Sequence, residues 1–133
     1  MKKKTAVALL CAVIVIAAAA LVCTNFIGKK PFASLKAEDI ASASVRLVPP
    51  DRTAPVTDLD ALAAALNDAV IYRKDSSYTE YNGQAVIYTI VLKGGTERAV
   101  NAYSPFLIID GVGYRANAES CEQLARIADG LIS

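Results

Sequence analysis

The sequence predicts an α+β fold, in which an antiparallel β-meander sheet with two amphipathic helices follows an N-terminal transmembrane or signal segment. Three observations lead to this prediction. Residues 6–23 are apolar without interruption. Three turn dipeptides separate hydrophobic runs further along the chain, and two stretches repeat apolar residues with the 3.6-residue period of a helix. The chain accordingly divides into an N-terminal segment (1–28), a tether (29–40) and an α+β domain (41–133).

The N-terminal segment has the features of both a membrane anchor and a cleaved signal. Lys2, Lys3 and Lys4 precede a run from residue 5 to 27 that only Thr24 and Asn25 interrupt. A helix of that length crosses about 30 Å of hydrocarbon, which favours an anchor. The small residues at 17–20 also satisfy a signal-peptidase pattern. The excess of lysines before the run places the N-terminus in the cytoplasm. We therefore expect either a single-pass protein of the cell membrane with its C-terminal domain outside, or a secreted domain.

The next elements are a strand and a helix. Residues 41–48 alternate apolar and polar side chains, the period of a strand with one buried face, and Pro49-Pro50-Asp51 ends it. Thr57 and Asp60 have the spacing of a capping box. Leucines at 59, 62 and 66 then fall on one face of a helix predicted over about 58–70.

The region from 76 to 115 predicts the meander. Asn82-Gly83, Gly94-Gly95 and Asp110-Gly111 are each typical of two-residue hairpin turns. They separate strands predicted near 76–81, 84–93, 97–103, 106–109 and 112–115. Asn117 then caps a helix whose apolar period continues to the C-terminus.

Two-residue turns fix the register of the strands and so assign side chains to faces. They place Tyr81 opposite Gln84, Tyr88 opposite Asn101 and Val86 opposite Tyr103. One face then holds small and branched residues that suit packing against helices: Ala85, Ile87, Val91, Val100 and Ala102. The opposite face presents a candidate ligand-binding group of Tyr81, Tyr88, Asn101 and Tyr103, since tyrosine combines apolar area with a hydrogen-bonding tip. The alternative is that these rings pack against the N-terminal strand or the tether.

Composition excludes several functions. The chain has no histidine, which excludes His-dependent triads and HExxH zinc sites. It also has no tryptophan, the side chain on which sugars most commonly stack. Residues 31–133 hold 9 lysines and arginines against 13 acidic residues, a formal charge of −4, so no nucleic-acid partner is expected. The carboxylate pairs Glu38/Asp39 and Asp58/Asp60 lack the spacing of a metal loop. Cys121 lies on the apolar stripe of the last helix as a buried thiol. No metal, cofactor or catalytic residue is predicted.

Three segments carry a resemblance to a known family: PFASLKAEDIASASVRLVPPD, VIYRKDSSYTEYNGQAVIYTI and NAYSPFLIIDGVGYRANAESCEQL. Together they resemble a small extracytoplasmic domain family of Gram-positive bacteria over about residues 31–132. Such domains occur alone behind an N-terminal anchor, or attached outside membrane proteins that resemble antibiotic-sensor metallopeptidases. The resemblance implies a location and an extent for the domain, and it implies no catalytic residues.

The function expected from these observations is that of a membrane-anchored, non-catalytic binding or sensing module that contacts an envelope protein or peptide. Two alternatives remain open. One is a carboxylate-dependent cell-envelope hydrolase, which requires a cleft with two converging carboxylates. The other is an accessory subunit of a membrane protein, which requires a large exposed aliphatic patch.

Overall fold

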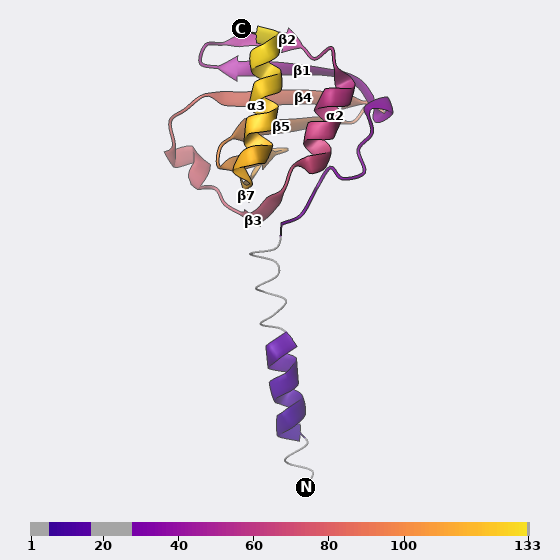
Figure 1. The fold of residues 1–133 in the computed structure, drawn as a ribbon. Helices are drawn as coiled ribbons and strands as arrows, with labels where there is room; N and C mark the ends of the chain where they lie inside the picture. The colour runs from indigo at the N-terminus through magenta and orange to yellow at the C-terminus, as the bar shows by residue number, and fades with distance from the viewer. Residues whose placement is uncertain (1–5, 17–27, 133) are drawn as a thin grey trace.

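The computed structural model describes residues 6–16 and 28–132, and over these ranges it is an α+β fold with a seven-stranded antiparallel sheet and three helices. The strands lie in the order β2-β1-β4-β5-β6-β7-β3. Helices α2 and α3 lie side by side across one face of the sheet (Figure 1). The strands are β1 (Ile40–Val48), β2 (Arg52–Pro55), β3 (Ile71–Lys74), β4 (Ala85–Leu92), β5 (Glu97–Tyr103), β6 (Phe106–Ile109) and β7 (Val112–Ala116), and the two helices are α2 (Leu59–Asp68) and α3 (Ala118–Ile132).

Part of the predicted membrane segment is described as a third helix, over residues 6–16. The remainder of the predicted anchor, residues 17–27, lies outside the described residues, as do residues 1–5. Within 6–16 and 28–132, no helix combines the length and the hydropathy that crossing a bilayer requires.

Both predicted amphipathic helices of the α+β fold are confirmed. Asp58 caps α2, with its Oδ1 accepting the backbone N–H of Ala61 at 3.0 Å, so the predicted capping role of Thr57 is wrong by one residue. Asn117 caps α3 as predicted, with its Oδ1 accepting the N–H of Glu119 at 2.8 Å. A side-chain acceptor at each N-terminus satisfies a backbone donor that the helix itself leaves free.

The predicted register between β4 and β5 is wrong by one residue. Tyr88 lies opposite Val100 and Val86 lies opposite Ala102. The loop holds three residues, because Leu92 N–H donates to Thr96 O at 2.8 Å, and of its two glycines only Gly95 has a positive φ, +89°. A two-residue type I′ turn needs positive φ at both central positions, whereas a three-residue loop needs one left-handed residue. A shift of one residue exchanges the two faces of a strand.

The Asp110-Gly111 turn is confirmed as a two-residue hairpin. Ile109 pairs with Val112, and the two central residues have φ of 49° and 86°. The Asp110 carboxylate also accepts the Ala99 N–H at 2.9 Å and the Arg98 Nε–H at 2.7 Å, which ties this turn to β5.

The strand predicted near 76–81 is absent from the described structure. A 3₁₀ helix, η2 (Ser77–Glu80), stands in its place, and Asn82-Gly83 is not a hairpin turn. The sheet gains two edge strands that the sequence did not predict. β2 follows the prolines after β1 and pairs with it, and β3 follows α2 and pairs with β7.

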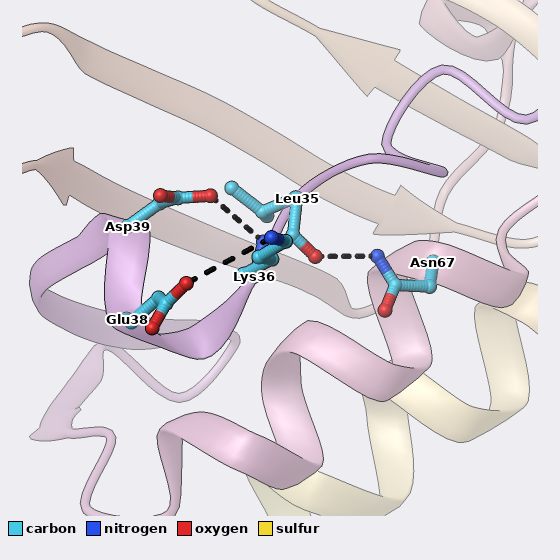
Figure 2. Close-up of polar contacts among 5 residues, drawn as sticks. All are labelled: Leu35, Lys36, Glu38, Asp39 and Asn67. Atoms are coloured by element: carbon cyan, nitrogen blue, oxygen red, sulfur yellow. Dashed lines mark hydrogen bonds and ion pairs between the residues drawn. The ribbon is translucent and has the colours of Figure 1, made fainter.

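The predicted tether, residues 29–40, packs against the α+β fold. Phe32 is buried in the core and Lys29 forms a β-bridge with Ile71. Figure 2 shows Asn67 of α2 directed at the carbonyl oxygen of Leu35, to which its Nδ2 donates at 2.7 Å. The same Nδ2 donates to Phe32 O at 2.7 Å. A 3₁₀ helix, η1 (Ala37–Asp39), then leads into β1. The segment is therefore fixed to the helix side of the sheet.

Candidate functional site

The face of the sheet opposite α2 and α3, here named the second face, is the candidate site. One row of paired residues crosses it, Ile87 beside Asn101, Asn101 beside Ile108 and Ile108 beside Gly113. Their neighbours along the strands, including Tyr88, Val100 and Leu107, point to the helices and are buried. Alternation along each strand therefore assigns the row to the second face.

Residues 75–84, here named the covering segment, lie over one end of the second face. A Cβ placed on Gly113 would come within 2.5 Å of both Asp75 O and the ring of Tyr78. A Cβ on Gly83 would lie 3.4 Å from the Tyr103 hydroxyl. The absence of a side chain at Gly113 thus allows the covering segment to lie directly on β7.

An aromatic cluster joins the covering segment to the sheet. Phe106 is fully buried, although it lies on the second face and outside the main core cluster. The rings of Tyr78 and Tyr81 meet it edge-on, with centroid distances of 6.2 and 5.4 Å, and the guanidinium of Arg115 lies 5.1 Å from its ring centroid. These are favourable aromatic and cation–π geometries. Tyr81 nevertheless remains 51 % exposed, so one side of its ring faces solvent.

Asn101 carries an unusual polar group at the centre of the second face. Its side-chain Oδ1 is buried and has no hydrogen-bond partner within the described part of the chain. The residue as a whole is only partly buried, between the half-buried Ile87 and the buried Ile108. A buried acceptor without a donor costs about 1–3 kcal/mol, so most such groups in folded proteins have a partner. The Asn101 Oδ1 therefore lacks the donor that buried acceptors normally have.

The structure brings three of the four predicted site residues to the second face. Asn101 and the half-buried Tyr103 alternate along β5, and Tyr81 projects from the covering segment beside Phe106. Tyr88 is not among them, so its predicted place on the open face is wrong. It is fully buried under α3, where its hydroxyl donates to the backbone oxygen of Leu124. Burial raises the pKa of that hydroxyl.

The Asp75 carboxylate, at the start of the covering segment, has several partners. Hydrogen bonds from the side chain and the backbone N–H of Ser77 hold the pKa of the Asp75 carboxyl below its usual range. The same carboxylate lies 3.4 Å from Arg115 Nε. Beside it is an open hollow of about 340 Å³, lined by Lys74, Asp75, Ser76, Tyr78, Gly111, Val112 and Gly113.

The carboxylates that the sequence singled out lie in caps and turns. Asp39 accepts the Lys36 backbone N–H at 3.0 Å and Glu38 lies 3.9 Å from Lys36 Nζ, as Figure 2 shows, while Asp58 caps α2. No group of three side chains able to hold a metal ion occurs among the residues that the structure describes.

The Cys121 thiol of α3 is buried next to the start of β6. Burial raises the pKa of this thiol to about 11, and its Sγ lies 3.4 Å from Phe106 O. A thiol in this state is a weak nucleophile at neutral pH.

Sequence reasoning missed Phe106 and Arg115 as parts of the site. The signal was present in the run Phe106–Ile109, whose four residues are all buried. A continuous apolar run is typical of a strand covered on both faces. Since α2 and α3 cover one face only, that run indicated a second cover over β6.

Comparisons of the chain with protein-family models, with curated proteins and with solved structures found no match.

Proposed function

We propose that this chain is a membrane-anchored, non-catalytic binding module of the extracytoplasmic space, and that it takes a peptide segment of an envelope protein on the second face of its sheet. The observation that carries the proposal is the unpartnered Oδ1 of Asn101 on a face that neither α2 nor α3 covers. Because this atom is buried while the residue is only partly so, a ligand's donor reaches it when the Asn101 side chain turns outward. The lysines before the apolar run of residues 6–23 support the anchoring.

The surroundings of Asn101 favour a peptide. The half-buried Ile87 lies beside Asn101, so a ligand that reaches the amide must offer a hydrogen-bond donor and apolar groups at once. A peptide does so through its backbone N–H and its aliphatic side chains. Tyr81 and Tyr103 add rings with hydroxyl tips at the edge of the same face, which supply contact area with little loss of side-chain entropy.

Site-specific photocrosslinking in intact envelopes tests the proposal. Tyr81 is replaced by p-benzoylphenylalanine, which preserves an aromatic ring at an exposed position. The matched control carries the same probe at the exposed Asp129 of α3, on the opposite side of the sheet. We expect one discrete crosslinked peptide from position 81, in clearly lower yield when Asn101→Leu is added, and none from position 129.

Two results would overturn the proposal. The first is an absence of any product from position 81, and the second is equal labelling from positions 81 and 129. A product that consists of polysaccharide rather than peptide would favour the cell-envelope hydrolase or another carbohydrate-directed role. A product from position 129 alone would favour an accessory subunit that docks through its helices.

A further inference from the structure

The structure fixes the place where the chain enters the α+β fold. The hydrophobic stretch of the sequence from residue 5 to 27, which Thr24 and Asn25 interrupt, is followed directly by Gly28. A Cβ on Gly28 would overlap the Val70 side chain and lie 3.1 Å from the Tyr72 ring, so the backbone is packed against this region. Lys29 N–H then donates to Ile71 O at 2.7 Å, and Ile71 N–H donates to Lys29 O at 2.8 Å. The described chain therefore packs on β3 from Gly28 onward.

Basic side chains gather at this entry point. Lys29 and Lys30 follow the apolar run, and Arg73 and Lys74 lie on β3, to which Lys29 is bridged. All four are exposed, and within 28–132 none is within ion-pair distance of a carboxylate. The nearby carboxylates are Asp75, which lies 3.4 Å from Arg115 and is also near Arg73, and Asp68 and Glu119, which line a hollow together with Lys30. These four residues, here named the β3 edge, are a local concentration of positive charge on a part of the chain, residues 31–133, with a formal charge of −4.

We infer that the β3 edge contacts the anionic phospholipid headgroups of the membrane that holds the N-terminal segment. This contact rests on the anchoring in the proposed function. An inserted apolar run that ends at residue 27 brings Gly28 to the headgroup layer, and the bridge to Ile71 brings β3 with it. Each lysine or arginine held near an anionic membrane surface strengthens the binding of the protein to that surface about fivefold. The domain is thus held edge-on, with β3 at the membrane and β2, at the other end of the strand order, roughly 29 Å away.

Lysine footprinting on the full chain tests this contact. The chain is reconstituted in vesicles of phosphatidylcholine alone, or with 30 % phosphatidylglycerol, and is acetylated with a membrane-impermeant reagent before mass spectrometry. Lys30 and Lys74 report on the β3 edge, and the exposed Lys36 and Lys93 are internal controls. We expect about fivefold slower acetylation of Lys30 and Lys74 on the anionic vesicles, reversed by high salt, with Lys36 and Lys93 unchanged.

A pair of charge-reversed variants sharpens the test. Arg73→Glu with Lys74→Glu removes half of the β3 edge and is expected to abolish the protection of Lys30. Arg52→Glu with Lys93→Glu changes the net charge equally but lies away from β3, since Arg52 is in the opposite edge strand. This control is expected to leave Lys30 protected.

Flotation of the vesicles separates failure of the two proposals. Equal acetylation of Lys30 in both kinds of vesicle, on a chain that floats with them, would overturn the headgroup contact and leave the anchoring intact. Loss of protection in both variants alike would also overturn it. A chain that does not float would overturn the anchoring in the proposed function, and the headgroup contact with it.

Discussion

The hydroxyl of Tyr88, at the centre of β4, donates a hydrogen bond to the backbone oxygen of Leu124 in α3. Both residues are fully buried. This contact joins the middle of the sheet to the middle of the longer helix, and it satisfies the one polar atom of a large apolar side chain. It also assigns the faces of the sheet, because the helix side of β4 must be the side of Tyr88.

Replacing Tyr88 by phenylalanine is expected to destabilise the fold modestly. The change removes one buried hydrogen bond and leaves the ring, a loss of about 1 kcal/mol, or roughly 4–8 °C in Tm. The control is Tyr114→Phe, since the half-buried Tyr114 makes no hydrogen bond through its hydroxyl within the described residues. Thermal unfolding followed by circular dichroism measures both. A Tyr88→Phe chain as stable as the parent would contradict the contact.

Local signals in the sequence predicted most elements of the fold and the order of the meander strands β4 to β7. They did not predict which face of β4 is buried. The dipeptide Gly94-Gly95 is compatible with loops of two and of three residues, and only Gly95 takes a positive φ. One residue of difference moved Tyr88 from the predicted open face to the core.

The covering segment could not be predicted because its structure depends on distant contacts. Asn82-Gly83 satisfies a hairpin rule, but Tyr78 and Tyr81 pack on Phe106, which lies more than 20 residues along the chain. Burial of those rings outweighs the local turn preference, as tertiary packing commonly does. The prediction of Asn101 and Tyr103 on the second face is correct, because the error of one residue in the register exchanged the two faces of β4 and not those of β5.

Gly113→Ala is expected to destabilise the chain by about 1–3 kcal/mol. The added methyl group would come within 2.5 Å of the Asp75 carbonyl and the Tyr78 ring, so the covering segment must move off β7. Gly94→Ala is the matched control, because nothing lies within 4 Å of its Cβ position. Urea unfolding measures the free energies. Equal stability of the two variants would show that the covering segment does not rest on β7.

Asn101→Leu is expected to leave the free energy of unfolding unchanged or to raise it slightly. The substitution replaces an acceptor that has no partner by an apolar group of similar shape. Asn67→Leu provides the contrast, since Nδ2 of Asn67 donates to Phe32 O and Leu35 O, and its loss should cost about 1–3 kcal/mol. A loss of more than about 1 kcal/mol in Asn101→Leu would mean that the amide already has a partner within the chain.

Acid is expected to weaken the turn between β6 and β7. The Asp110 carboxyl is partly buried, which raises its pKa, but the Ala99 N–H and Arg98 outweigh this and hold the pKa below its usual range. A carboxyl with a lowered pKa stabilises the fold above the unfolded-state pKa, and that stability is lost as pH falls through the folded-state pKa. The free energy of unfolding from urea titrations between about pH 5 and pH 2 should fall less in Asp110→Asn than in the parent, by up to about 1 kcal/mol because the group is half exposed. An equal loss of unfolding free energy with falling pH in the parent and in Asp110→Asn would contradict this expectation.

The affinity of the second face for its ligand tests the central claim most directly. The peptide crosslinked from position 81 is synthesised and titrated by calorimetry against the parent chain, Asn101→Leu and the control Asp129→Asn. Loss of one hydrogen bond to the Asn101 acceptor predicts about tenfold weaker binding for Asn101→Leu, with Asp129→Asn unchanged. Equal affinity of Asn101→Leu and the parent chain would contradict the assignment of the second face as the binding site.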